Sequence, residues 1–528
     1  MTPSTTLPDE IASAAATMGN TPIIFHSAAR GEEPTTLGAL YSDACVIAAN
    51  LRGAGIGPGD VVAIQLPNWR ECVLAHAAAW LVGATVLPIV SIYGPTELSF
   101  ILRQSEACLY IGPRALHDRD HSPLFEAAAH VPSVVRRVVV GEQGVGEQGV
   151  GERWDGVQEF GDLLIARPEG FSRYTPADPS ERALLVYTSG TTADPKGVQH
   201  SHKTLLAEVR AMEEHRGGGP APSCLAVFPP GHIAGVLGII RVLRHGATTV
   251  LMEAWDPAVA ADLIARYRIE ASAGAPIHLA GILDAAELSG VDISCLSEYT
   301  TGAANVAADL IRRADRLGVK AFRCYGSTEH PTISSGSSDD PLSKRATTDG
   351  RITPGTTVRI VDDSDRPVEP GVDGEILCRG PEQFVGYTDR ALNETGFLDG
   401  WFRTGDVGHL DADGYLQITD RKKDIIVRGG ENISSKEIED VLLSHPAVAE
   451  VAAVGMPDAR YGERVCVFVV VRDGYTLDFP DVQNHFASRG LARQKTPERL
   501  EVVELLPRTA IGKVKKPTLR QMLSRRTR

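Results

Sequence analysis

Residues 183–197 read ALLVYTSGTTADPKG, and this stretch joins a buried segment to a polar turn. The apolar run at 183–187 predicts a strand, and the glycine that follows lets the backbone turn tightly with its N–H groups directed at an anion. Four hydroxyls and one ammonium supply further donors around Gly190: Thr188, Ser189, Thr191, Thr192 and Lys196. The spacing fits neither the Walker A loop nor the dinucleotide fingerprint. The stretch therefore predicts another kind of phosphate-binding loop, with a Ser/Thr-rich surface loop as the alternative.

Short β-rich runs alternate with helical segments over the first half of the chain. Strands are predicted at 60–66 and 84–90, and a helix at 258–267. This alternation is typical of βαβ units with parallel sheets. After Gly350, short strands are separated by turns, at 357–361, 375–378 and 415–419. We therefore expect an α/β fold with mixed and parallel sheets, flanking helices and a β-rich section.

A charged string at 420–424, DRKKD, separates this part from a compact α/β pattern. That pattern consists of a helix at 435–443 and strands at 448–454 and 465–471. A chain of 528 residues exceeds what one hydrophobic core usually organises. We expect a large N-terminal domain at 1–419, a hinge at 420–423 and a small mobile C-terminal domain at 424–528.

Composition excludes several classes of protein. The formal net charge of −14 argues against nucleic acid as a partner, because phosphate backbones demand clustered Lys and Arg. The eight cysteines stand singly, which suits a reducing compartment better than disulfides or a zinc site. The apolar stretch at 73–90 is long enough for a membrane span, but His76, Gly83 and Pro88 interrupt it. We therefore expect a buried helix followed by a strand, no transmembrane segment, no signal peptide and a cytoplasmic protein.

A direct repeat, GEQGV, occurs twice at 141–150. Tandem Gly, Glu and Gln residues without an apolar face cannot pack a core, so the repeat predicts an exposed loop.

Five further motifs follow the loop in a fixed order: YGSTE at 325–329, WFRTGD at 401–406, DRKKD at 420–424, GGENI at 429–433 and PRTAIGK at 507–513. With the loop, they resemble the adenylate-forming superfamily, which includes acyl-CoA synthetases, luciferases and peptide-synthetase adenylation domains. The series covers most of the chain. The resemblance implies an ATP-dependent acid–CoA ligase that uses Mg²⁺, forms an acyl-adenylate and pyrophosphate, and then transfers the acyl group to coenzyme A.

The resemblance also implies roles for the nucleotide-binding residues. The loop from Thr188 to Lys196 would hold the β- and γ-phosphates of ATP. Tyr325 would stack on adenine beside Gly326 and Ser327, Thr328 would contact the α-phosphate, and Glu329 would hold Mg²⁺, a cation that prefers oxygen ligands. The adenine and acyl side would be lined by small residues: Gly302, Ala303 and Ala304.

Asp406 would accept the ribose hydroxyls, and Arg421 would support the ribose from the hinge. A capping Asp in the TGD turn is the alternative for Asp406. Lys513 would be the catalytic lysine, because an ammonium relieves the repulsion between a carboxylate and the α-phosphate it attacks. The alternative is a surface lysine near Lys515 and Lys516. Lys423 matches the hinge position about which the C-terminal domain rotates in the family. This rotation would bring the residues on the CoA side to the site: Gly429, Gly430 and Glu431.

His232 would border the acyl pocket together with Gly231 and Gly235. Relatives often carry an aromatic residue before this histidine, so Gly231 would remove bulk near the pocket. Ser435 replaces a proline common in relatives, and we expect little consequence. The residues near His232 and at 302–327 are mainly small or apolar, which favours an apolar acid: a medium- or long-chain fatty acid, or an alicyclic or steroid-like one.

Two other functions stay open. An adenylating enzyme that loads the phosphopantetheine of a carrier protein would use the same kind of thiol. A nucleotide-binding homologue without catalysis is the second, and the intact Glu329, Asp406, Arg421 and Lys513 argue against it. The expected partners are a small carboxylic acid, ATP and CoA, and a homodimer also stays open.

Overall fold

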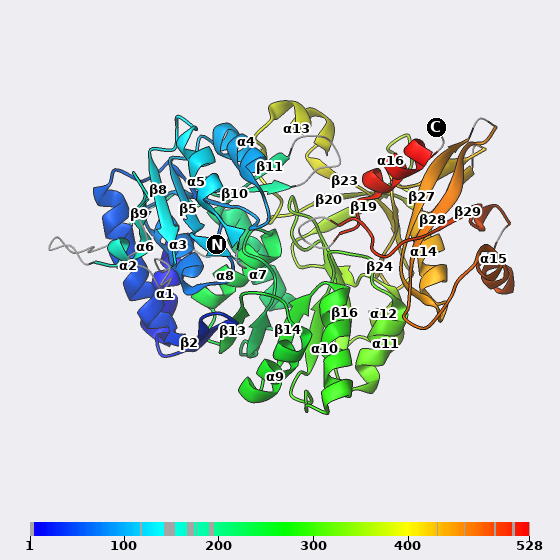
Figure 1. Ribbon diagram of the computed structural model, residues 1–528, viewed down its shortest axis with the longest axis horizontal. Coiled ribbons are helices and arrows are strands. Elements are labelled where there is room, and N and C mark those ends of the chain that lie inside the picture. The colour runs from blue at the N-terminus through cyan, green and yellow to red at the C-terminus, as the bar shows by residue number, and fades with distance from the viewer. Residues whose placement is uncertain are drawn as a thin grey trace.

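The computed structural model describes residues 5–116, 119–141, 154–165, 174–175, 177–188, 195–429, 431–458, 460–489, 491, 493–508 and 513–526. The GEQGV repeat lies almost entirely outside these residues. Figure 1 shows the N-terminal elements on one side of the molecule and the C-terminal elements β27, β28 and α14 to α16 on the other. A large N-terminal part and a smaller C-terminal part are therefore present, and the expected α/β fold is confirmed.

The first sheet carries the phosphate-loop strand. Within the described residues it has eight strands in the order β21-β11-β10-β4-β3-β5-β8-β9. The strands from β10 to β9 are parallel, whereas β10 pairs antiparallel with β11. The bounds are β3 Val61–Ile64, β4 Thr85–Pro88, β5 Leu109–Pro113, β8 Arg136–Val140, β9 Gln158–Glu159, β10 Arg182–Thr188, β11 Lys196–Ser201 and β21 Gly386–Tyr387.

The second sheet contributes residues to the wall of the candidate site. Its nine described strands run in the order β18-β17-β16-β15-β14-β12-β13-β1-β2. The central strands are β12 Cys224–Ala226, β13 Thr249–Met252, β14 Ala271–Gly274, β15 Glu298–Thr301 and β16 Lys320–Tyr325. They are parallel, and the helices α9 Pro257–Tyr267, α10 Pro276–Ser289 and α11 Ala308–Arg316 connect them. Two further helices, α3 Arg70–Leu81 and α8 Ile233–Arg244, share one apolar core with both sheets.

The apolar stretch at 73–90 folds as the sequence indicates. Helix α3 ends at Leu81, Gly83 turns the chain at φ +82°, and β4 follows. A positive φ at this point is tolerated by glycine without steric cost. None of the helices described in the structure is both long and apolar enough to cross a bilayer.

The β-rich section leads directly to the C-terminal part. It contains β19 Thr357–Val361, β20 Gly374–Arg379, β22 Phe397–Leu398, β23 Trp401–Leu410 and β24 Leu416–Arg421. The C-terminal part has its own apolar core between a sheet and helices. Its elements are β25 Ile426–Arg428, β26 Glu431–Ile433, α14 Ser435–Leu443, β27 Val448–Asp458, β28 Gly462–Val471, α15 Phe479–Ser488, β29 Arg499–Val502 and α16 Lys516–Arg526. The charged string begins at the end of β24 and turns where the Asp424 N–H donates to the Arg421 carbonyl at 2.8 Å.

Candidate functional site

A cavity of about 1690 Å³ lies between the two large sheets, the β-rich section and the C-terminal part. Its lining brings together motif residues that are separated by up to 325 positions along the chain, from Thr188 to Lys513. The predicted residues in contact with it are Thr188, Lys196, Gly231, His232, Gly235, Gly302, Ala303, Ala304, Tyr325, Gly326, Ser327, Thr328, Glu329, Asp406, Arg421, Lys423 and Lys513. The structure thus gathers the candidate nucleotide and acyl residues in one place.

The predicted phosphate loop connects two antiparallel strands, β10 and β11. Thr188, the last residue of β10, is directly opposite Lys196, the first residue of β11. The loop therefore leaves and re-enters the sheet at one point, and its ends are held by the β ladder. Ser189, Gly190, Thr191 and Thr192 lie outside the described residues.

Tyr387 is a site residue that sequence reasoning missed. Its hydroxyl donates to Glu329 Oε1 at 2.8 Å, and the Lys196 ammonium lies 5.7 Å from the centre of its ring. Burial, followed by the neighbouring Glu329 carboxylate, raises the pKa of Tyr387 well above its usual value. Tyr387 therefore stays protonated and fixes one oxygen of Glu329. Fifty-eight residues separate the two along the chain, so no local pattern signals the contact.

His200 is a second missed residue, and it fixes the backbone of Thr328. Its Nε2–H donates to the Thr328 carbonyl at 2.7 Å, while Nδ1 accepts from the Thr204 hydroxyl at 3.0 Å. Burial lowers the pKa of His200 to about 4, so the ring is neutral and this tautomer persists at physiological pH. The strand after the phosphate loop is thereby tied to the loop that carries Glu329.

Asp406 is buried and accepts hydrogen bonds at both carboxylate oxygens. The Arg421 Nε lies 2.9 Å from Oδ1, and the Tyr325 hydroxyl donates to Oδ2 at 2.7 Å. Each oxygen keeps lone-pair capacity for a further donor. The charge of Asp406 raises the pKa of Arg421, and burial raises the pKa of Tyr325. This cluster presents a carboxylate fixed in position to the cavity.

Lys513 reaches this cluster from the C-terminal part. Burial, followed by the charge of Arg421, lowers its pKa to about 8, although the carboxylates of Asp406 and Glu329 act in the opposite direction. The Lys513 ammonium therefore lies near enough to Asp406 and Glu329 for both carboxylates to act on its pKa. The described C-terminal part is therefore in an orientation that closes the cavity with Lys513.

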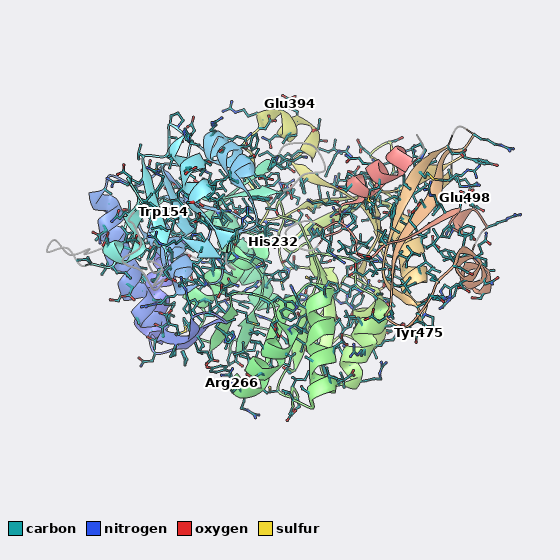
Figure 2. The ribbon with its side chains drawn as sticks, viewed as in Figure 1. Trp154, His232, Arg266, Glu394, Tyr475 and Glu498 are labelled. Atoms are coloured by element: carbon teal, nitrogen blue, oxygen red, sulfur yellow. The ribbon has the colours of Figure 1, made fainter. Side chains whose placement is uncertain are left out.

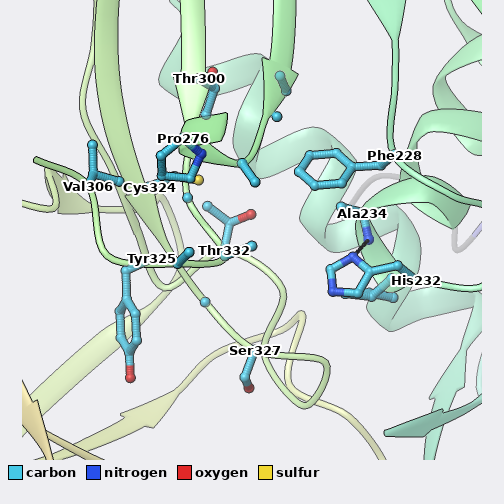
Figure 3. A pocket seen from close by; sticks show the side chains of 18 of the residues that line it. Phe228, His232, Ala234, Pro276, Thr300, Val306, Cys324, Tyr325, Ser327 and Thr332 are labelled. Atoms are coloured by element: carbon cyan, nitrogen blue, oxygen red, sulfur yellow. Dashed lines mark hydrogen bonds between the residues drawn. The ribbon is translucent and has the colours of Figure 1, made fainter. Parts of the chain in front are cut away.

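His232 caps the N-terminus of α8. Its Nδ1 accepts from the Ala234 N–H at 3.2 Å, a contact visible in the close view of the cavity (Figure 3). Burial, and then the nearby Lys513 charge, lowers the pKa of His232 to about 3. The ring is neutral and lies near the middle of the molecule (Figure 2), where it forms part of the cavity wall.

The interpretation of Gly231 as a source of pocket volume is wrong. A Cβ at this position would lie 2.6 Å from both Cα and N of Val90, so the side-chain direction is occupied by backbone. Gly235 is similarly confined, because a Cβ there would lie 2.0 Å from the Pro229 carbonyl oxygen. Both glycines allow two chain segments to approach closely, and neither opens the cavity.

The lining of the acyl side is also less apolar than the sequence suggests. Figure 3 shows Phe228 and His232 on one side of the cavity and Tyr325 on the other, with Thr332 between them. Farther in, charged side chains join the apolar ones: Glu208, Arg216, Arg241 and Glu298.

The predicted CoA-side residues do not line this cavity. Gly429 donates its N–H to the Tyr461 carbonyl at 2.7 Å, and Glu431 Oε2 accepts from the Gln494 side chain at 2.8 Å. Gly430 lies outside the described residues. Gly429 and Glu431 are thus held by contacts within the C-terminal part and are not part of the cavity wall.

Ser435 matters more than expected. Its N–H donates to Asp420 Oδ2 at 2.6 Å, its hydroxyl donates to Asp420 Oδ1 at 3.1 Å, and the Lys516 ammonium donates to its hydroxyl at 2.7 Å. A proline would lack the N–H, so the serine adds a link between α14 and the start of the charged string.

Two family models match the chain. Residues 11–388 match the AMP-binding enzyme model, and residues 437–513 match the AMP-binding enzyme C-terminal domain model. The chain belongs to the AMP-binding enzyme family. This is the adenylate-forming superfamily that the motifs indicate, and the curated relatives place the chain on its CoA-ligase branch.

Relatives of this AMP-binding enzyme share about a third of its residues. A medium-chain fatty-acid–CoA ligase of Escherichia coli (strain K12) is 32% identical over 500 residues, which is 93% of this chain and 86% of the relative. A 3-[(3aS,4S,7aS)-7a-methyl-1,5-dioxo-octahydro-1H-inden-4-yl]propanoyl:CoA ligase of Rhodococcus jostii (strain RHA1) is 33% identical over 534 residues, 98% of both chains.

The fold of the AMP-binding enzyme also matches solved structures over nearly its full length. ATP-bound MatB from Rhodopseudomonas palustris has a TM-score of 0.85 at 25% identity, with 98% of this chain and 99% of the other covered. The o-succinylbenzoate CoA synthetase MenE from Bacillus subtilis, in complex with its acyl-adenylate, has a TM-score of 0.83 at 25% identity, with 97% and 98% covered.

Proposed function

We propose that the protein is an ATP-dependent acid–CoA ligase that converts a carboxylate and ATP to an acyl-adenylate and pyrophosphate, and then transfers the acyl group to CoA. The observation that carries the proposal is the position of Lys513, which lines the same cavity as Thr188 and Lys196 and whose pKa responds to both Asp406 and Glu329. Family membership and the CoA-ligase relatives support the same assignment.

Each cluster has one task in this proposal. Lys513 neutralises the charge that develops between the attacking carboxylate and the α-phosphate. Asp406, held by Tyr325 and Arg421, accepts the ribose hydroxyls. Thr328, positioned by His200, donates to the α-phosphate.

Glu329 fits a magnesium ion that arrives with the nucleotide. The described residues contain no group of three or more His, Cys, Asp or Glu side chains that could form a protein cage. Magnesium at nucleotide sites uses one or two carboxylates together with phosphate oxygens, so a single carboxylate is sufficient. Tyr387 holds one oxygen of Glu329 and leaves the other for the cation, which supplies positive charge to the phosphates when bound.

The hinge proposal rests on where residues of the C-terminal part lie relative to the cavity. Lys513 closes the cavity, whereas Gly429 and Glu431 do not line it. If residues 420–423 act as the hinge, rotation of the C-terminal part withdraws Lys513 and presents the GGENI segment to the thiol. The strand β24 ends within this segment, which is where hinges commonly absorb backbone change.

We further propose an acid with a largely apolar body, either a medium- or long-chain fatty acid or an alicyclic one. Apolar walls from Phe228, Leu237 and Phe322 support this class. The two relatives named above act on acids of both kinds by their names, one a medium-chain fatty acid and the other a bicyclic propanoic acid.

The proposal is tested by acid-dependent pyrophosphate release across a panel of fatty and alicyclic acids. We expect release only when acid, ATP and magnesium are all present, followed by thioester formation with free CoA. Absence of release with every acid would contradict the proposal. Thioester formation with a carrier protein but not with CoA would instead favour the carrier-loading alternative.

A further inference from the structure

One face of α8 forms a groove that leads away from the candidate carboxylate site. Ala234, Gly238 and Arg241 are spaced by three or four residues, so they share one side of α8, and His245 follows the last residue of the helix. All four line the cavity. The first two are small, and a Cβ built on Gly238 meets nothing within 4 Å outside the helix itself. From His232 to Arg241 this face extends about 13 Å along the helix axis.

The groove ends at Glu208, a buried carboxylate, and at its partly exposed guanidinium partner, Arg241. Arg241 Nη2 lies 3.1 Å from Glu208 Oε1, and the same oxygen accepts from the Thr332 hydroxyl at 3.1 Å. The Glu208 side chain is 1% exposed, whereas that of Arg241 is 33% exposed. A guanidinium carries five N–H donors, and the Glu208 contact occupies one of them. Within the described residues, the Nε–H of Arg241 is buried and has no hydrogen-bond acceptor, so the exposed part of the side chain belongs to its other atoms and a ligand can reach only the remaining Nη donors.

A second guanidinium stands at the same end. Arg216 lines the cavity after the last turn of α7 (His202–His215), and burial followed by the charge of Arg241 lowers its pKa. Glu298, on β15, lies close enough to oppose this shift, and burial raises its own pKa. The guanidinium groups of Arg241 and Arg216 therefore share this part of the cavity with three carboxylates, Glu208, Glu298 and Asp339.

An unsubstituted alkyl chain fits this end poorly. Apolar atoms against Arg241 would keep its remaining donors from water without offering an acceptor, and a buried unpaired donor is costly. An oxygen on the ligand would accept from these donors through charge-assisted bonds. Because the carboxylates at this end, Glu208, Glu298 and Asp339, already offset the two guanidinium charges, a neutral carbonyl on the ligand suits the position better than a second carboxylate.

We infer that the acid carries a hydrogen-bond-accepting oxygen at the end opposite its reacting carboxylate, and that Arg241 determines this specificity. A ketone is the group that fits this position best. The inference rests on the proposed function, since it assumes that the reacting carboxylate lies beside Lys513. It adds a polar group at the far end of the acid, which a purely apolar cavity would not select.

The test uses three acids of one length: decanoic acid, its analogue with a ketone next to the terminal methyl group, and decanedioic acid. We expect kcat/KM for acid-dependent pyrophosphate release to favour the oxo acid over decanoic acid by about 10- to 100-fold. The variant Arg241→Met should lose this preference while still adenylating decanoic acid. Preference for decanedioic acid that is lost in Arg241→Met would support the inference with a carboxylate as the distal group.

Two controls keep the outcome interpretable. Arg244→Met makes the same change on the same helix, but Arg244 pairs with Glu10 and Glu213 and does not line the cavity, so the oxo preference should persist. If Arg241→Met fails to fold because Glu208 is left unpaired, the double variant Arg241→Met/Glu208→Gln removes that charge. Equal use of all three acids by the native enzyme, or an oxo preference that survives loss of Arg241, would overturn the inference but leave the ligase function intact. No release with any acid would instead mean that the ligase proposal itself fails.

Discussion

Asp406 and Arg421 face each other across the antiparallel strands β23 and β24, with Arg421 Nε 2.9 Å from Asp406 Oδ1. The pair joins the proposed ribose carboxylate to the last residue of β24, where the charged string begins. The proposed nucleotide site and the proposed hinge segment therefore share one ion pair, so a ligand that engages Asp406 would also act on the residue that leads into the C-terminal part.

The variant Asp406→Asn keeps the side-chain shape but removes the negative charge that Arg421 and the ribose hydroxyls require. Hydrogen bonds to charged groups contribute roughly 1.5–3 kcal/mol, so kcat/KM for ATP should fall by about 10- to 100-fold. The measurement is acid-dependent pyrophosphate release at varied ATP. Asp413→Asn, an exposed aspartate on the neighbouring turn, serves as the control. A near-normal ATP dependence in Asp406→Asn would contradict the assigned role.

The variant Lys513→Ala should separate the two half-reactions. Loss of a charge-stabilising group from a water-excluded site should reduce acyl-adenylate formation by at least about 10²–10³-fold. Thioester formation from synthetic acyl-adenylate and CoA should stay near the native rate, because the proposed rotation withdraws Lys513 before that step. Both steps are timed in single turnover, with the exposed Lys515→Ala as the matched control. Equal slowing of both steps would mean that Lys513 only supports the fold.

The pH dependence of adenylation should report the lowered pKa of Lys513. Burial holds that pKa at about 8, below its ordinary 10.5, so the ammonium is present below pH 8 and is lost as the pH rises above it. Since kcat/KM reports groups of the free enzyme, it should decline above about pH 8. In Lys513→Arg the residual activity should lack this decline, because a guanidinium stays charged throughout the range. The same decline in both proteins would assign it to another group.

The variant Lys423→Pro tests the hinge. Proline fixes φ, and within the described residues the Lys423 N–H donates no backbone hydrogen bond that the substitution would remove. Adenylation should be kept, because the structure already has Lys513 in the cavity, whereas thioester formation should fall by at least about 10-fold. Lys422→Ala in the same string serves as the control. Unchanged thioester formation would place the rotation axis elsewhere.

The variant Gly238→Leu should reduce the size of the acyl cavity without disturbing the backbone. Its side chain enters open space on the cavity face of α8, so kcat/KM for bulky acids should fall by about 10-fold or more while a short acid is still adenylated. Gly231→Ala should behave differently, because its Cβ meets the Val90 backbone and should cost about 1–3 kcal/mol of stability. Thermal unfolding and kcat/KM for short and bulky acids distinguish the two. A uniform loss for all acids in Gly238→Leu would count against the groove.

Local elements could be predicted closely from the sequence. The strand expected at 357–361 is β19 Thr357–Val361, and the helix expected at 435–443 is α14 Ser435–Leu443. The strand before the phosphate loop and the interrupted apolar stretch also fold as expected. Such elements depend on alternation, helical spacing and turn residues, which are all properties of neighbours in the chain.

Contacts between distant segments could not be predicted. Tyr387 meets Glu329, His200 meets the Thr328 carbonyl, and a Cβ at Gly231 would strike Val90, although nothing near these residues in the chain indicates their partners. Arg241 likewise reads as a polar residue at the end of an apolar helix until α8 is packed between the sheets.

The sequence by itself determined the elements, the order of the motifs and the chemical types gathered for nucleotide chemistry. The tertiary structure decided which direction each side chain faces and which groups share a cavity. The reason is physical: secondary structure follows from local backbone preference and periodicity, whereas the surroundings of a side chain depend on how whole sheets and helices pack. That packing makes Gly231 a close backbone contact and Gly238 an opening, although both are glycines on one short segment.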